Sequence, residues 1–229
     1  MGGGGFSMEP DNRLLDDFIL GLTGRARPRV LFLPTATGNV ATYLVNFYTA
    51  FSRRAEASHL DLFVRTGDDV GRLLLEQDVV YVGGGNTANL LAIWRVHGLD
   101  AILRTAWRTG VVMAGLSAGA ICWFHAGVTD SFGPELEALD GGLGFLPGSF
   151  CPHYDGEPAR RPTFRRLVGE RRLPDGWAAD DGAALHFVGE DLADVVSSRQ
   201  SARAYRLERS PDEGAADATE TELATRFLG

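Results

Sequence analysis

Lysine is absent from this sequence of 229 residues, and all 22 basic residues are therefore arginine. A Walker-type phosphate loop, a pyridoxal phosphate Schiff base and a serine–lysine catalytic dyad each require a lysine amine. The composition alone thus excludes these three kinds of chemistry.

Long apolar runs and a basic leader segment are also lacking. No apolar stretch reaches the roughly 20 residues of a membrane-spanning helix, and the opening residues MGGGG lack the basic and apolar regions of a signal peptide. The formal net charge of −8, with no arginine-rich run interleaved with aromatic residues, argues against nucleic acid as a partner. We therefore expect a cytoplasmic protein with neither a membrane nor a nucleic-acid partner.

Cysteine is scarce, since only Cys122 and Cys151 occur. Two cysteines fit reduced, buried thiols better than a disulfide framework. No residue pattern requires a metal ion or an organic cofactor, and we expect a monomer or a homodimer.

Apolar runs of strand length alternate with segments of helical periodicity through the first half of the chain. We expect strands at residues 29–34, 61–65, 79–82 and 111–116, and helices at residues 12–22, 42–51, 87–96 and 99–107. This alternation predicts an α/β fold, with a mostly parallel sheet flanked by helices on both faces. Ligands of such sheets bind beyond the C-terminal ends of the strands.

The second half has a different composition. Residues 127–156 are rich in Gly, Pro and Asp and predict loops and short strands, and further short strands are expected at residues 183–188, 195–198 and 202–207. The last residues are polar and acidic, which predicts a loose tail or a marginal helix. We therefore divide the chain into one α/β hydrolytic domain, residues 1–208, and an acidic C-terminal tail, residues 209–229.

Ser117 is the first candidate for a catalytic residue. It is the central residue of Gly115-Leu116-Ser117-Ala118-Gly119, directly after an apolar run and directly before a run of small residues. A G-x-S-x-G sequence between a strand and a helix predicts a sharp turn that presents the serine hydroxyl, with small flanking residues that avoid a backbone collision. The helix that follows would offer its N-terminal N–H groups and dipole to an oxyanion.

A second glycine-rich turn, Gly83-Gly84-Gly85, also follows a predicted strand. Such a turn is compatible with a tight strand-to-helix connection in which Asn86 or Thr87 caps the helix. It is also compatible with one side of an oxyanion hole or substrate site, with N–H groups from Gly85 and Ala118 as donors. The presence of an exposed serine favours the oxyanion interpretation.

A nucleophilic serine needs a base, and His153 is the best candidate among the five histidines. It lies in a loop after a Gly/Pro-rich passage, the kind of place where triad histidines are presented. His125 lies eight residues after Ser117, which places it two turns along the expected helix and away from the turn. The acid that would orient the histidine stays open at this point, with Asp130, Asp155 and the adjacent pair Asp180-Asp181 as candidates and Asp130 close to equal with Asp181.

These motifs in this order resemble peptidase family S51, which includes aspartyl dipeptidase (peptidase E) and, more distantly, cyanophycinase. The motifs are GGGNT, then G-x-S-A-G-A, then Pro-His in a loop, and then an acid–glycine turn, and the resemblance covers roughly residues 1–207. It implies a fold like that of class I glutamine amidotransferases, with serine in place of their cysteine. It also implies a serine peptidase that cleaves small peptides, namely dipeptides with an N-terminal aspartate, and we therefore expect a small peptide substrate as its partner.

The resemblance also implies a role for each matching residue. By it Ser117 is the nucleophile and His153 the general base, and Gly85 and Ala118 supply the oxyanion hole. For the acid it favours Asp181 first and Asp130 second. Its arginine in this region, a ligand for the substrate carboxylate, matches Arg160 or Arg161, while Asn86 and Thr87 are assigned to substrate binding.

Two other functions compete with this one. An esterase of the α/β-hydrolase type would carry an HGGG-type loop upstream and a triad histidine near the C-terminus, yet no histidine follows His186. An amidotransferase-like module without catalytic activity would not need a triad, and a glutaminase would need cysteine at position 117.

Overall fold

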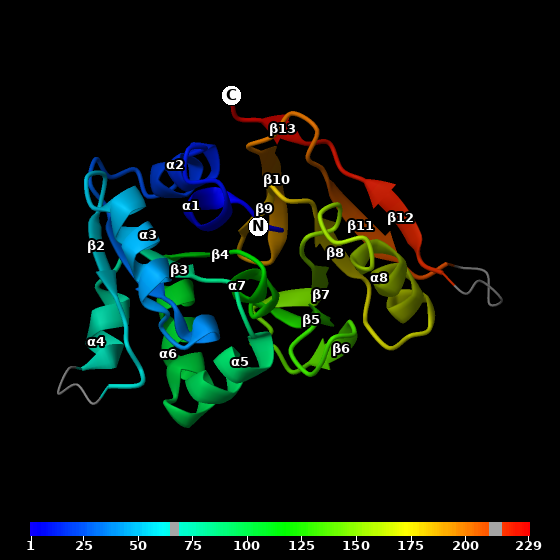
Figure 1. Cartoon of the computed structure of the whole chain (residues 1–229), viewed down its shortest axis with the longest axis horizontal. Helices are drawn as coiled ribbons and strands as arrows, with labels where there is room; N and C mark the ends of the chain where they lie inside the picture. The colour runs from blue at the N-terminus through cyan, green and yellow to red at the C-terminus, as the bar shows by residue number, and fades with distance from the viewer. Residues whose placement is uncertain (65–68, 211–216) are drawn as a thin grey trace.

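The structure is a computed structural model that describes residues 1–64, 69–210 and 217–229 (Figure 1). A four-stranded parallel sheet has the strand order β2-β1-β3-β4. Its strands are β1 (Arg29–Leu33), β2 (Glu56–His59), β3 (Val79–Val82) and β4 (Val112–Gly115). Helices surround it: α1 (Gly5–Met8), α2 (Leu14–Gly21), α3 (Ala41–Phe51), α4 (Val70–Leu75), α5 (Thr87–Val96) and α6 (Leu99–Arg108).

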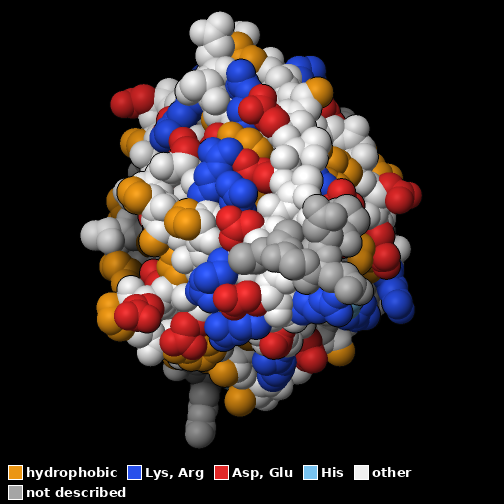
Figure 2. Space-filling model, turned by 90° about the vertical axis from the view of Figure 1, so that its right-hand side faces the viewer, with side chains coloured by type: hydrophobic (Ala, Val, Ile, Leu, Met, Phe, Trp, Pro, Cys, Tyr) orange, Lys and Arg blue, Asp and Glu red, His pale blue; other side chains and the backbone are white. Residues whose placement is uncertain are grey.

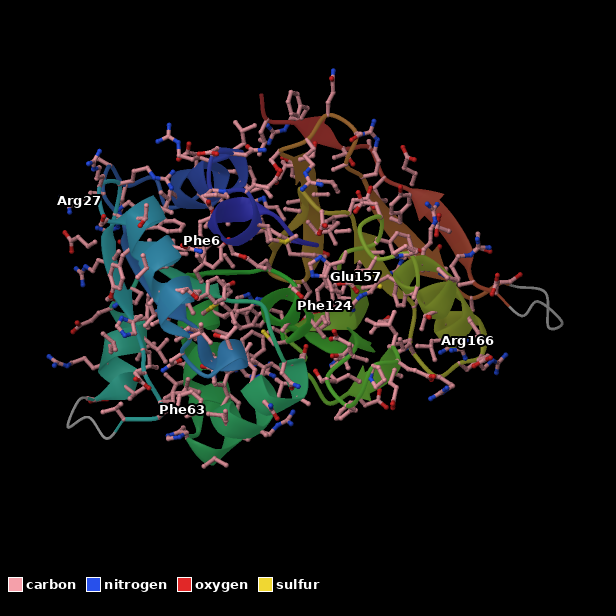
Figure 3. The ribbon with its side chains drawn as sticks, viewed as in Figure 1. Phe6, Arg27, Phe63, Phe124, Glu157 and Arg166 are labelled. Atoms are coloured by element: carbon pink, nitrogen blue, oxygen red, sulfur yellow. The ribbon has the colours of Figure 1, made fainter. Side chains whose placement is uncertain are left out.

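Alternating side chains of β1 and β3 pack on opposite faces of this sheet, as strand geometry requires. Phe32 and Tyr81 belong to a core shared with Phe6 of α1, labelled in Figure 3, and with Phe47 of α3. Leu31, Val80 and their neighbours belong to the other large core, which includes Leu90 and Trp94 of α5 and Leu103 of α6. Helices therefore cover both faces of the parallel sheet, which confirms the predicted α/β fold.

The strand predicted at residues 61–65 was wrong. The structure has β2 at Glu56–His59 instead, residues 61–64 form no strand, and residue 65 lies outside the described residues. β2 is an edge strand of sequence EASH that is only half buried, so it lacks the apolar signature of a central strand. Asp61 ends the extended segment, since its side chain accepts a hydrogen bond from Phe63 N at 2.8 Å.

A second sheet of six strands has the order β12-β11-β8-β7-β5-β6, in which β7 runs parallel to both β5 and β8 and the other pairs are antiparallel. Its strands are β5 (Phe124–Thr129), β6 (Glu137–Asp140), β7 (Leu146–Cys151), β8 (Gly176–Ala179), β11 (Ala204–Glu208) and β12 (Thr219–Glu222). Helix α8 (Arg160–Gly169) packs on it through Phe164, Leu167 and Val168. A smaller sheet, β13-β10-β9, consists of β9 (Ala183–Val188), β10 (Asp191–Ser197) and β13 (Arg226–Phe227).

The last residues are neither a loose tail nor a helix where the structure describes them. Strand β12 pairs with β11, and β13 pairs with β10. The sequence TETE alternates in a way that suits an exposed edge strand, but its polarity hides it from a search for apolar runs. Figure 2, which faces the α8 and β12 side of the molecule, shows acidic and basic side chains interspersed. One ion pair beside β12 joins Arg165 of α8 to Asp217.

Residues 1–3 lie between the parallel sheet and the β9 sheet. Met1 N donates to Gly115 O at 2.9 Å, Gly2 N donates to Ala183 O at 3.0 Å, and Gly3 pairs with Asp181. In Figure 1 the N-terminus accordingly lies beside β9, near the end of β4. Strands β4 and β9 also line an apolar cavity of about 530 Å³ with residues of α2 and the Trp123–Phe124 region. No helix within the described ranges is both long and apolar enough to span a membrane.

Candidate active site

The turn at Ser117 connects β4 to α7 (Ala118–Ile121) and is forced by close backbone approach. Ser117 has φ 53° and ψ −118°, an unusual conformation for a residue with a side chain. A Cβ atom at Gly115 would lie 2.0 Å from Gly119 O, and a Cβ atom at Gly119 would lie 2.3 Å from Val82 O. Only glycine fits at either position, which is the geometry that the G-x-S-x-G sequence predicts.

The helix after the turn is shorter than expected. It has four residues, and His125 lies in β5 as an exposed residue instead of two turns along a helix. The segment at 143–145 stops the helix, because Leu143 N donates to Cys122 O and Phe145 N to Trp123 O, both at 2.8 Å. The polar groups next to Ser117 are therefore individual backbone amides and not the end of a long helix dipole.

His153 and Asp181 come together from two different strand ends. His153 follows β7 and has φ 53°, and its Nδ1 lies 2.7 Å from Asp181 Oδ1 at the end of β8. Each side chain is only 12% exposed. A carboxylate on Nδ1 fixes the imidazole tautomer and leaves Nε2 for proton transfer.

The charged surroundings of Asp181 favour its ionised form. Burial alone would raise the pKa of Asp181, but the hydrogen bond and charge of His153, together with Arg199 and Arg160, bring it below the usual value. Asp155, the candidate next to the histidine, accepts a hydrogen bond from Asp181 N at 2.8 Å. Asp155 thus holds the acid turn and does not contact the imidazole.

Asp130 lies apart from this pair. Its side chain is 60% exposed, and its nearest cation is Arg160 Nη2 at 4.0 Å. The structure therefore brings Asp181, and not Asp130, onto His153.

Ser117 and the His153–Asp181 pair flank residues 1–3. Ser117 N donates to Met1 O at 3.3 Å, and Gly182 N donates to Gly3 O at 3.1 Å on the other side. Within residues 1–64, 69–210 and 217–229, no hydrogen bond joins the Ser117 hydroxyl to His153. Ser117 follows the C-terminal end of β4 in the parallel sheet, and His153 and Asp181 follow those of β7 and β8 in the six-stranded sheet. Ligands of α/β proteins bind beyond such strand ends.

The glycine-rich turn after β3 leaves one of its amides unused. Gly83 N donates to Leu33 O at 3.1 Å, Gly84 N to Tyr43 Oη at 3.0 Å and Asn86 N to Ala36 O at 2.9 Å. Gly85 has φ 134°, and among the described residues its N–H has no acceptor, nor has that of Ala118. These two free amides are the donors that the sequence predicts for an oxyanion hole.

Asn86 and Thr87 are engaged in structural contacts. Asn86 caps α5 by accepting from Asn89 N at 2.8 Å, and its Nδ2 donates to Ser131 O at 3.0 Å. Ser131 Oγ accepts from Thr87 N at 2.9 Å and from Ala88 N at 3.3 Å. No sequence pattern predicts the role of Ser131, because this contact joins α5 to a segment 44 residues further along the chain.

Arg160 and Arg161 differ in their surroundings. Arg160 is 3% exposed, and it donates to Glu157 at 2.6 Å and to Val128 O at 2.9 Å. Glu157 precedes α8 and is labelled in Figure 3. Arg161 is half exposed, pairs with Glu220 and lies over the rings of Tyr154 and Tyr205. Both guanidinium groups thus already have carboxylate partners within the chain.

Cys122 and Cys151 are buried free thiols, and burial raises the pKa of each well above its usual value. Over the described parts of the chain, no group of three or more His, Cys, Asp or Glu side chains has an arrangement that could hold a metal ion.

Comparison with known proteins gives consistent matches. A sequence model of peptidase family S51 matches residues 1–195. The chain is 54% identical to the uncharacterized peptidase YgaJ of Bacillus subtilis over 230 residues, covering 100% of this chain and 97% of that one. It is 30% identical to Peptidase E of Streptomyces coelicolor over 207 residues, 86% of this chain and 83% of that one. The fold is similar to that of a peptidase from an acI-B1 Actinobacterium, with a TM-score of 0.70 at 18% identity over 98% of this chain and 92% of that one.

Proposed function

Because this chain belongs to peptidase family S51 and is a serine-type peptidase, we propose that it hydrolyses small peptides, chiefly dipeptides with an N-terminal aspartate. The observation that carries this proposal is the 2.7 Å contact between His153 Nδ1 and Asp181 Oδ1, which lies across residues 1–3 from the sharp turn at Ser117. A paired imidazole and a serine hydroxyl at a strained turn are the parts that acyl transfer requires.

In the proposed reaction Ser117 Oγ attacks the scissile carbonyl carbon while His153 Nε2 takes the hydroxyl proton. Gly85 N–H and Ala118 N–H stabilise the oxyanion, and His153 then gives its proton to the leaving amine as the C–N bond breaks. A water molecule then attacks the carbonyl carbon of the acyl-enzyme while His153 Nε2 takes its proton. His153 returns that proton to Ser117 Oγ as the ester C–O bond breaks, and the acyl group leaves as a carboxylic acid. The proton transfer requires His153 to reach Ser117 in the substrate complex, where catalytic hydrogen bonds commonly tighten.

Aspartate specificity is the finer part of the proposal. A relative in Streptomyces coelicolor is named Peptidase E. Arg160, whose charge helps to lower the pKa of Asp181, lies 4.0 Å from Asp130. Among the described residues, Arg160 Nη2 makes no hydrogen bond and lies 4.0 Å from Asp130 Oδ1, so a substrate carboxylate that displaces Asp130 would find a donor there. We also propose a cytoplasmic location, where the two buried thiols stay reduced.

A dipeptide library tests the function directly. The purified protein is given Asp-Xaa, Glu-Xaa, Asn-Xaa and Ala-Xaa series, together with p-nitrophenyl esters, and rates are compared with those of Ser117→Ala and of Ser52→Ala as a matched control. We expect preferential hydrolysis of Asp-Xaa and a loss of about 10⁴-fold or more for Ser117→Ala alone. Equal rates across the four series would refute aspartate specificity, and ester hydrolysis without peptide hydrolysis would point to an esterase instead.

A further inference from the structure

Tyr43 of α3 contacts the glycine-rich turn from behind. Its hydroxyl accepts a hydrogen bond from Gly84 N at 3.0 Å, across 41 positions of sequence. The ring is fixed by aromatic neighbours, with centroids 5.1 Å from Phe32 and 5.6 Å from Phe6. The hydroxyl group therefore occupies a defined position under the turn.

The turn lies between Tyr43 and the nucleophile. A Cβ atom at Gly83 would lie 2.8 Å from Tyr43 Cε1 and 3.1 Å from its hydroxyl oxygen, so the backbone rests directly on the phenol. On the opposite side, a Cβ atom at Gly84 would lie 3.3 Å from the Cβ atom of Ser117. The Gly83–Gly84 segment therefore separates the Tyr43 phenol from Ser117, and a shift of this backbone on loss of the phenol contact would be felt at Ser117.

The hydrogen bond from Gly84 N–H also bears on which amide of the turn stays free. Gly83 N, Gly84 N and Asn86 N each have an acceptor inside the protein, so in the described chain only Gly85 N–H is left over in this run of four. An amide without its acceptor rotates to find another partner, since an unsatisfied buried N–H is costly. Because the Tyr43 hydroxyl oxygen accepts from Gly84 N–H, the Gly84–Gly85 peptide is free to direct Gly85 N–H toward the site.

We propose that Tyr43 is a positioning residue for the oxyanion hole, because its hydroxyl holds the Gly83–Gly84 peptide so that Gly85 N–H stays directed at the developing oxyanion. This inference rests on the proposed peptidase function and adds a residue that does not touch the substrate. The phenol suits the role because it stays uncharged: burial raises the pKa of Tyr43, as does Asp16, and these outweigh the opposing hydrogen bonds from Ser7 and Gly84.

Tyr43→Phe tests this role, because it removes the acceptor and keeps the ring. We expect kcat to fall about 10- to 100-fold while KM stays within about threefold, since the oxyanion contact is made mainly in the transition state. The affinity for an Asp-derived boronic acid, which forms a tetrahedral adduct with serine, should weaken by the same factor as kcat. Tyr48→Phe is the matched control: Tyr48 lies on the same helix and bonds His59 Nδ1 at 2.7 Å, away from the turn, so its kcat should match wild type.

Amide hydrogen exchange separates this inference from the proposed function. In the Ser117→Ala background, Tyr43→Phe should accelerate exchange at Gly84 N–H by at least about tenfold, and Tyr48→Phe should not. The inference is overturned if Gly84 exchange is unchanged, or if Tyr43→Phe keeps wild-type kcat in an active enzyme. A wild-type protein that hydrolyses no peptide would instead refute the proposed function, whatever the exchange result.

Discussion

The turn that carries Ser117 and the turn that carries Asp181 are held by different forces. At Ser117 the constraint is steric, because Gly115 and Gly119 allow backbone atoms to approach where any Cβ atom would collide. At Asp181 the constraint is polar, because Asp155 accepts from Asp181 N and Asp180 accepts from Arg203 N at 2.9 Å. A steric constraint leaves a local sequence pattern, whereas a polar constraint is assembled from distant residues and leaves none.

The polar turn at Asp181 can be tested by asking which carboxylate, Asp181 or Asp130, orients His153. Asp181→Asn should lower kcat by about 10⁴-fold, because the amide favours the wrong tautomer of His153. Asp130→Asn is the matched control and should change kcat by no more than about fivefold, since the Asp130 side chain is 60% exposed and Arg160 Nη2 lies 4.0 Å away. Steady-state kinetics on one Asp-Xaa substrate measure both. A larger loss of kcat in Asp130→Asn than in Asp181→Asn would instead assign the role of triad acid to Asp130.

The steric turn can be tested by adding one carbon atom. Gly119→Ala should destabilise the protein by about 2–4 kcal/mol, because the new Cβ atom would lie 2.3 Å from Val82 O and the backbone would have to move. Gly133→Ala adds the same atom where nothing lies within 4 Å, and it should be nearly neutral. Urea unfolding gives both free energies. Equal stabilities for the two variants would show that the turn is not sterically enforced.

A smaller effect is expected from the pH dependence of stability. Burial raises the pKa of Asp16 from 3.8 to about 6, and Tyr81 is its hydrogen-bond partner at 3.2 Å. The folded state therefore binds this proton more tightly than the unfolded chain, so the contribution of Asp16 to stability falls as pH rises from about 4 through about 6.

Asp16→Asn should flatten the decline in melting temperature over this pH range. Asp11→Asn, at an exposed position three residues before α2, should leave the slope unchanged. Identical slopes in wild type and Asp16→Asn would contradict the assigned origin of the effect.

The same division explains how much of the fold could be predicted from sequence. Strands β1, β3 and β4 and helices α2, α3, α5 and α6 were predicted because their apolar patterns are local. Edge strands β2 and β12 were missed because their residues are polar.

The site follows the same rule. The position of Ser117 and the sharp turn around it were predicted from five consecutive residues. The short length of α7 was not, because the Cys122 and Trp123 carbonyl groups are taken by a segment about 20 residues further along the chain. The residue patterns alone left Asp130 and Asp181 nearly equal as candidates for the triad acid. Only the folded backbone brings β7 and β8 together and so places Asp181 next to His153.

Labelling with a fluorophosphonate probe tests the central claim, the nucleophilic role of the Ser117 hydroxyl, most directly. The account predicts a single adduct, located by mass spectrometry on the peptide that contains Ser117, with a labelling rate that falls steeply in Asp181→Asn. An active protein that takes up no probe, or that carries the adduct on another residue, would contradict it.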